Sequence, residues 1–125
     1  MATTSELVPL LLADDIVRSL KFYRDMLGFS VVQQWEPDGK LAWCRIERDQ
    51  VALMLQQACA EDGPAVGRGR GVMFYFHCTD AVAEYTRLCD LGLQLSPPEI
   101  AFYGMQQLFL RDLDGYELCF QNPTC

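Results

Sequence analysis

The chain of 125 residues reads as two copies of one pattern, and this repeat limits its fold more than any other feature. Adding 65 to a residue number carries four polar or turn residues onto residues of the same type: Asp15 to Asp80, Gly39 to Gly104, Asp49 to Asp114, and Gln56 to Gln121. A repeated unit of this kind predicts two similar modules. We place the first at about 6–57 and the second at about 72–122, joined by a linker at about 58–71, within a single domain 1–125.

The first half carries local signals for a strand, a helix and three further strands. An apolar run at 7–12 predicts a buried strand. Asp15 is a suitable N-cap for the helix that follows, and Gly28 provides its C-terminal stop. The other strands are predicted at 29–35, 41–46 and 51–56, with a Pro37-Asp38-Gly39 turn between the first two.

The second half repeats these signals after a glycine-rich segment that ends at Gly71. A strand at 72–78 is followed by Asp80 as N-cap and by a helix that ends at Gly92. The remaining strands are predicted at 93–95, 106–111 and 116–121. Each half is therefore expected to form a four-stranded sheet with one helix on one face.

The predicted strands carry apolar side chains on both faces, although one helix covers only one of them. Because side chains alternate along a strand, the strand at 72–78 is expected to turn one set toward the helix and one set away from it: Val72, Phe74 and Phe76 against Met73, Tyr75 and His77. The last strand likewise has Leu118 and Phe120 on one face, and on the other face Glu117, Cys119 and Gln121. The second face must meet another module, a ligand, or both.

The formal net charge of −7 argues against partners that bind through positive charge. Nucleic acids and anionic membrane surfaces both select basic patches, so neither is expected as a partner, whereas a cationic ligand is favoured. No apolar run approaches the ~20 residues that span a bilayer, and the first residues lack the pattern of a secretory signal. We therefore expect a cytoplasmic protein with reduced cysteines, and an exposed Cys125.

Two motifs together resemble the vicinal-oxygen-chelate superfamily, which includes glyoxalases, extradiol dioxygenases, and fosfomycin- and bleomycin-resistance proteins. The first is the S-x-x-F-Y-x-x-x-L-G-F helix that begins at Ser19, preceded by Val8-Pro9-Leu10. The second is the closing D-x-D-G-Y hairpin that begins at Asp112. The resemblance implies an α+β fold in which paired βαβββ modules form a half-open curved sheet around a cavity. It also implies a homodimer, usually with modules paired across the subunits.

The resemblance also indicates where metal-using members hold their ion. Those positions fall on Val8, Met54, Met73 and Cys119, none of which offers the oxygen or imidazole nitrogen that a hard or borderline divalent ion requires. We therefore expect no metal and no cofactor. These four side chains are expected to form an apolar surface where the ion would otherwise sit. One alternative is that they are ordinary core residues, and another is that their sulfur atoms form a soft Cu(I) site.

Other candidate ligand contacts are polar or aromatic. His77 and Glu117 are candidate general bases, and Glu117 and Gln121 could also meet a cationic ligand. Four aromatic residues could wall a planar guest, with core or interface packing as the alternative: Trp35, Trp43, Tyr75 and Tyr103. Arg45 and Arg111 could clamp an anion, or instead pair with Glu47 and Asp112.

The leading hypothesis is a metal-independent small-molecule binding protein that resembles bleomycin-resistance proteins and takes a cationic or aromatic ligand, with a role in antibiotic resistance. One alternative is an enzyme, a lyase, isomerase or dioxygenase of the glyoxalase type, that uses His77 or Glu117 without the usual metal ligands. The other alternative is a dimeric interaction or regulatory domain.

Overall fold

The computed structural model describes residues 1–124, so the expectation for Cys125 lies outside the described residues. The chain divides into two compact units, unit 1 at Met1–Gly63 and unit 2 at Pro64–Cys125. Each unit is an α+β fold with one four-stranded sheet. Within the described residues, no helix is long and apolar enough to cross a membrane.

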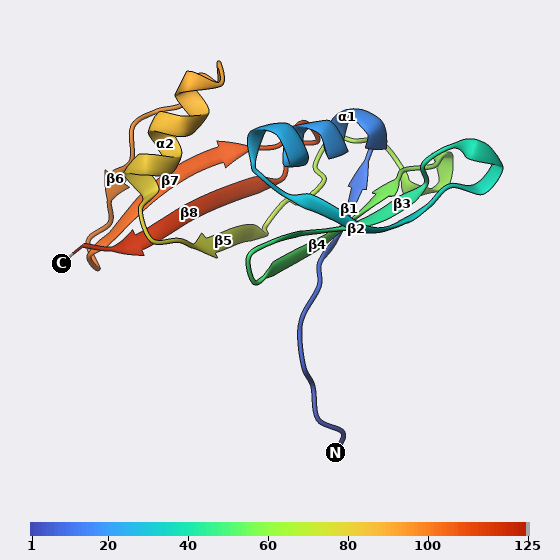
Figure 1. Cartoon of the computed structure of the whole chain (residues 1–125), viewed down its shortest axis with the longest axis horizontal. Coiled ribbons are helices and arrows are strands. Elements are labelled where there is room, and N and C mark those ends of the chain that lie inside the picture. The colour runs from blue at the N-terminus through green and yellow to red at the C-terminus, as the bar shows by residue number, and fades with distance from the viewer. Residues whose placement is uncertain (125) are drawn as a thin grey trace. The chain divides into compact units, whose positions relative to one another are not determined.

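Unit 1 follows the predicted order of strand, helix and three strands (Figure 1). Its elements are β1 Leu10–Ala13, α1 Ile16–Lys21, the π-helical turn η1 Phe22–Met26, β2 Ser30–Trp35, the 3-10 turn η2 Pro37–Gly39, β3 Trp43–Arg48, β4 Val51–Gln57 and the 3-10 turn η3 Ala60–Asp62. The sheet order is β1-β4-β3-β2, in which β1 and β4 are parallel and the other neighbours are antiparallel.

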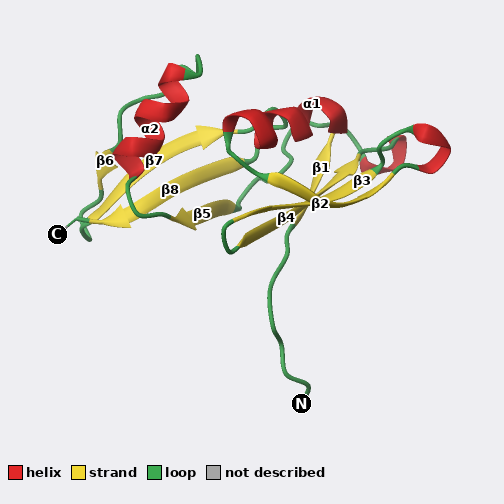
Figure 2. Ribbon diagram, in the orientation of Figure 1, coloured by secondary structure: helices red, strands yellow, loops and turns green. Residues whose placement is uncertain are grey.

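Unit 2 has the same topology with the order β5-β8-β7-β6. Its elements are β5 Met73–His77, α2 Ala81–Asp90, β6 Glu99–Ile100, β7 Met105–Arg111 and β8 Glu117–Pro123. Strands β5 and β8 are parallel, and α2 lies over one face of the sheet (Figure 2).

The repeat extends to single hydrogen bonds. The Asp15 carboxylate accepts from the N–H of Arg18 at 3.2 Å, and Asp80 accepts from the N–H of Ala83 at 3.0 Å. A second pair of bonds joins the last strand of each unit to the first residue of its helix: Gln57 accepts from Ile16 at 3.0 Å, and Asn122 accepts from Ala81 at 2.8 Å. All four residues of the second copy lie 65 positions after those of the first. The predicted repeat is confirmed.

Several element boundaries differ from the prediction, as in β3, which is Trp43–Arg48 rather than 41–46. β1 begins at Leu10 rather than at residue 7, because Pro9 has no N–H to donate to a sheet. The predicted strand at 93–95 is wrong: an edge strand of only two residues, β6, follows the Pro97-Pro98 pair instead. Val72 precedes β5 and is 49% exposed, so it does not face the helix as predicted.

The first helix also changes its winding before Gly28. α1 ends at Lys21 and continues as η1, in which the N–H of Leu27 donates to the carbonyl of Phe22 at 3.2 Å. Arg48 of β3 donates from Nη1 to the carbonyl of Leu27 at 3.0 Å, which satisfies a carbonyl at the end of this helical segment.

The core of each unit lies between its helix and its sheet. In unit 1 it includes Tyr23, Ile46 and Leu55, all with at most 1% exposure. In unit 2 the rings of Phe76 and Phe120 stack with centroids 4.9 Å apart, as expected for same-face neighbours on β5 and β8.

The glycine-rich segment before β5 is a succession of turns. Backbone N–H groups donate three residues back at three successive points: Arg68 to Ala65 at 3.1 Å, Arg70 to Gly67 at 3.1 Å, and Val72 to Gly69 at 3.0 Å. Gly69 has φ +71°, and a Cβ there would lie 2.6 Å from the ring of Tyr116. Because Tyr116 is buried, its ring has no free space to move into.

Gly69→Ala is expected to lower the free energy of unfolding by about 1–3 kcal/mol more than Gly67→Ala does. Both substitutions place a Cβ at positive φ, but nothing lies within 4 Å of a Cβ at Gly67, so the difference isolates the clash with Tyr116. Urea denaturation of both variants measures the two values. Equal losses would contradict the close packing of Gly69 against Tyr116.

Thiol reactivity is expected to follow burial. Burial raises the pKa of the Cys119 thiol to about 11 and also raises the pKa of Cys44, which disfavours the reactive thiolate at both positions. Iodoacetamide at pH 8 should modify the exposed Cys59 and leave Cys44 and Cys119 intact, as read by peptide mass mapping. In urea all three should react, and equal labelling of Cys119 and Cys59 in the folded protein would contradict this packing.

Candidate ligand-binding faces

Each sheet has one face packed on its helix and a second face, called here the open face. On the open face of unit 2 the strand register places side chains in three rows across β5, β8 and β7. The charged row is Met73, Glu117 and Arg111; the aromatic row is Tyr75, Cys119 and Phe109; and the amide row is His77, Gln121 and Gln107. Same-face neighbours in a sheet lie within side-chain contact distance, so these rows form one continuous surface.

The two charged residues of the charged row form an ion pair with each other. Arg111 donates from Nη2 to Oε1 of Glu117 at 2.8 Å. The predicted pairing of Arg111 with Asp112 is wrong, because Asp112 is buried and accepts from the backbone N–H groups of Asp114 and Tyr116, both at 2.9 Å. The carboxylate of Glu117, considered above for a cationic ligand or as a base, therefore already has a cationic partner within the sheet.

The aromatic row presents two exposed rings on either side of a buried thiol. Tyr75 is 47% exposed and Phe109 is 39% exposed, whereas Cys119 between them is fully buried. With its pKa raised by burial, Cys119 acts as a small apolar residue of this surface. Flat aromatic ligands stack or pack edge-on against such rings.

The amide row continues into a chain of hydrogen bonds, called here the amide ladder. Gln107 donates from Nε2 to the hydroxyl oxygen of Tyr103 at 2.6 Å and to Oε1 of Gln121 at 3.0 Å. Nε2 of Gln121 lies 3.3 Å from Nε2 of His77. The two glutamines are 6% and 7% exposed, whereas Tyr103 and His77 are exposed. Polar groups buried at this level require partners, and each glutamine has them inside the ladder.

Gln107 was not among the residues predicted from the sequence. Alternation along 106–111 puts Gln107, Phe109 and Arg111 on one face, which was a usable signal. Placing that face beside Gln121 also required the register of the β7–β8 hairpin.

Two cavities border the charged row. One, of about 370 Å³, is lined by Met73, Phe109, Leu110, Arg111, Glu117 and Leu118. The other, of about 470 Å³, is lined by the glycine-rich segment 65–71 together with Arg111, Asp114, Gly115 and Glu117. Both volumes are within the range of small-molecule sites.

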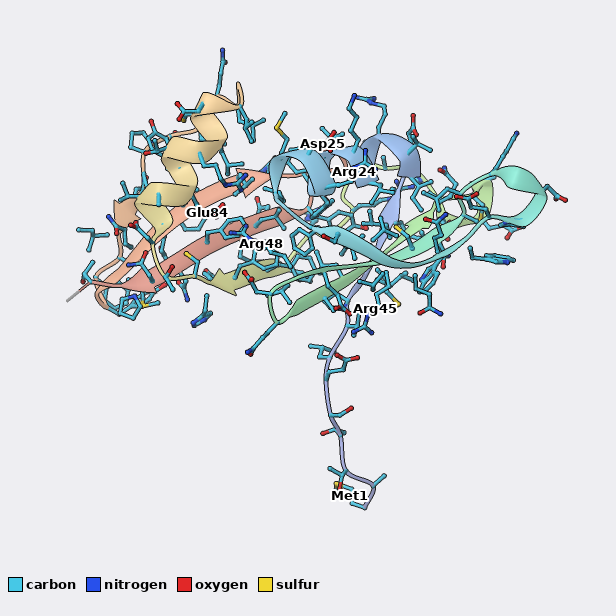
Figure 3. The ribbon with its side chains drawn as sticks, viewed as in Figure 1. Met1, Arg24, Asp25, Arg45, Arg48 and Glu84 are labelled. Atoms are coloured by element: carbon cyan, nitrogen blue, oxygen red, sulfur yellow. The ribbon has the colours of Figure 1, made fainter. Side chains whose placement is uncertain are left out.

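The open face of unit 1 is aromatic at one end and charged at the other. Trp35 and Trp43 are direct cross-strand neighbours, and Trp35 is 62% exposed. Arg45 pairs with Glu47 at 2.8 Å, as predicted, and also with Glu6 at 3.1 Å. The bond from Arg45 lowers the pKa of the Glu6 carboxyl. Figure 3 shows Arg45 on the side of the sheet away from α1.

The predicted site residues separate by unit. Val8, Trp35, Trp43 and Met54 belong to unit 1, with Met54 beside Leu10 of β1 and Val8 just before that strand. Seven others belong to unit 2: Met73, Tyr75, His77, Tyr103, Glu117, Cys119 and Gln121. Tyr103 lies in the turn between β6 and β7 and is joined to the open face by Gln107.

The four positions at which a metal was considered do not fit a hard divalent cation. Val8 has no donor atom, Met54 and Met73 have only thioethers, and the Cys119 thiol is buried with a raised pKa. Across residues 1–124, no group of three His, Cys, Asp or Glu side chains is arranged to hold a metal ion.

Several solved structures share this fold. The bleomycin resistance determinant encoded on the transposon Tn5 has a TM-score of 0.77 at 19% identity, covering 98% of this chain and 100% of that one. The bleomycin-binding protein from bleomycin-producing Streptomyces verticillus, complexed with copper(II)-bleomycin, has a TM-score of 0.69 at 18% identity. The match covers 100% of this chain and 99% of that one. TnmS3, an antibiotic binding protein from Streptomyces sp. CB03234, has a TM-score of 0.76 at 18% identity, and the match covers 99% of each chain.

Among the curated proteins, the sequence comparison finds no match to this chain. The family described as the Glyoxalase/Bleomycin resistance protein/Dioxygenase superfamily matches residues 7–120, which is most of the chain. The chain belongs to the glyoxalase/bleomycin resistance protein/dioxygenase superfamily.

Proposed function

We propose that this protein is a metal-independent small-molecule binding protein whose ligand lies on the open face of unit 2. The observation that carries the proposal is the order of the three rows there. Exposed aromatic rings lie between a matched ion pair and a neutral amide ladder. Apolar area with a few well-placed polar groups is the usual composition of a small-molecule site.

This arrangement favours an aromatic ligand over a strongly cationic one. Tyr75 and Phe109 offer ring faces and edges, whereas Glu117 is held by Arg111 at 2.8 Å. A cationic ligand would have to share that carboxylate with the guanidinium, and an exposed ion pair of this kind contributes little binding free energy. The net charge of −7 still helps to attract a cation to the surface, but it does not bind one at this face.

The fold supports an antibiotic-like molecule as the ligand class. The Streptomyces verticillus protein is complexed with copper(II)-bleomycin, and TnmS3 is an antibiotic binding protein. Binding without chemistry is further supported by the donor set, since none of Val8, Met54 and Met73 offers a hard ligand. The two candidate bases, His77 and Glu117, lie in different rows and each has a hydrogen-bond partner within the sheet.

We also propose that the chain is a homodimer. Two tryptophans, Trp35 and Trp43, are cross-strand neighbours on the open face of unit 1, and Trp35 is 62% exposed. Clustered exposed apolar side chains commonly mark an interface.

Light scattering coupled to size-exclusion chromatography is expected to give a mass near 28 kDa, twice the 14.2 kDa of one chain. Trp35→Ser should shift the equilibrium toward the monomer, because it removes exposed aromatic area. Val17→Ser, at a position 62% exposed on α1, is the matched control and should leave the dimer intact. A wild-type mass near 14 kDa at micromolar concentration would exclude the dimer.

Ligand binding is expected to depend on the aromatic row and not on metal. We would titrate the protein with bleomycin, 2-acetylnaphthalene and 2,6-diacetylnaphthalene by calorimetry, with and without EDTA. At least one compound should bind equally in both buffers. Tyr75→Ala and Phe109→Ala should each weaken that binding by about 1–2 kcal/mol, because each removes ring contact with the ligand.

Val82→Ala is the control for these variants, since Val82 is 42% exposed on α2, outside the open face. Its affinity should equal that of the wild type. The proposal fails if none of the three compounds binds, if EDTA abolishes binding, or if the Tyr75 and Phe109 variants bind as tightly as the control.

A further inference from the structure

The amide ladder connects two exposed groups through a buried centre. Tyr103 and His77 are its exposed ends, and Gln107 and Gln121 are its buried middle. Each glutamine is shared between two neighbours, so the orientation of one amide fixes that of the next. Buried amides have no water to replace a lost partner, which makes a mismatched orientation costly.

Only two orientations of the ladder satisfy every bond. In the one that the structure shows, Gln107 donates to Tyr103 and to Gln121, and the amide nitrogen of Gln121 faces His77. Nε2 of a neutral His77 must then accept, so its ring proton is on Nδ1. The Tyr103 oxygen also accepts, so its own proton points away from the ladder. Both ends therefore offer hydrogen-bond donors.

The second orientation turns both amides by 180° and reverses both ends. Oε1 of Gln107 then accepts from Tyr103 and Gln121, and Oε1 of Gln121 accepts from an Nε2–H of His77. The Tyr103 oxygen and the His77 Nδ1 would both present lone pairs. Turning only one amide places two N–H groups or two carbonyl oxygens against each other in the buried centre, which disfavours it by roughly ten-fold or more.

We propose that the ligand contacts both ends of the amide ladder, and that the two ends act together, either both as hydrogen-bond donors or both as acceptors. We call this the two-point reading. In the observed orientation, the amide ladder selects a planar molecule with carbonyl-type acceptors toward both ends. Gln107 and His77 are separated by two strand spacings, about 10 Å, and the Tyr103 hydroxyl lies 2.6 Å from Gln107, so the two donors that meet the ligand are on the order of 10 Å apart. This inference rests on the proposed function for the ligand, but the coupling between Tyr103 and His77 is a property of the protein alone.

The coupling can be read from the ring of His77, which is the only histidine of the chain. At pH 8.5 an ordinary imidazole is neutral, and two-bond ¹H–¹⁵N spectra of histidine-labelled protein show which nitrogen carries the proton. The wild type should show the Nδ1–H tautomer. Gln107→Glu introduces a carboxylate that only accepts, which turns Gln121 and should change His77 to the Nε2–H tautomer.

Gln106→Glu is the matched control, because it adds the same charge one residue away on the opposite face of β7. It should leave the Nδ1–H tautomer in place. A Gln107→Glu spectrum equal to that of Gln106→Glu overturns the coupling, because residue 107 reaches His77 only through Gln121.

A ligand titration tests the polarity without relying on the fold of that variant. 2,6-Diacetylnaphthalene should bind wild-type protein roughly ten-fold more tightly than 2-acetyl-6-ethylnaphthalene, which has a single carbonyl. Tyr103→Phe removes one donor and should abolish this preference. Equal affinities for the two naphthalenes in the wild type overturn the two-point reading.

The two tests separate failure of this inference from failure of the proposed function. If neither naphthalene binds, the diketone ligand of this inference is wrong, and the proposed function fails only if bleomycin does not bind either. The tautomer measurement still decides whether the ends are coupled. If a naphthalene binds without preference for the diketone, the proposed function stands and the two-point reading fails.

Discussion

In each unit, one side-chain amide on the last strand ties the helix to the sheet. Gln57 of β4 accepts the N–H of Ile16 at 3.0 Å, and Asn122 of β8 accepts the N–H of Ala81 at 2.8 Å. Each last strand runs parallel to the first strand of its unit, so these bonds fix where the helix begins relative to the sheet. One face is covered as a result, and the ligand contacts proposed here lie on the face that is left open.

Most of the fold was predictable because its signals are local. Asp15 and Asp80 cap their helices as expected, since a cap requires only a side-chain oxygen near the first turn. β6 could not be placed in the same way, because two residues of an edge strand carry no pattern and depend on pairing with β7. The π-helical winding at η1 was also missed, since side-chain packing decides it rather than composition.

The candidate site was predictable as a face but not as a network. Alternation placed Tyr75 and His77 away from the helix, and the burial of Phe76 between them agrees with that assignment. The partners of the charged and amide rows depend on the β7–β8 register, which the turn after Arg111 sets and the sequence alone does not give. Asp112 was assigned to Arg111 by proximity, but it is used by its own turn.

The chemistry of the open face of unit 2 favours recognition by shape and hydrogen bonding over recognition by charge. A buried carboxylate there would need a permanent cationic partner and could only accept hydrogen bonds. Glutamine avoids the cost of burying a charge and presents a donor and an acceptor on one planar group. Two such groups in series, Gln107 and Gln121, must turn together, and in the orientation that the structure shows, the amide nitrogens face both Tyr103 and His77. Under the proposed function, a ligand that contacts both ends of the amide ladder therefore meets two hydrogen-bond donors at once.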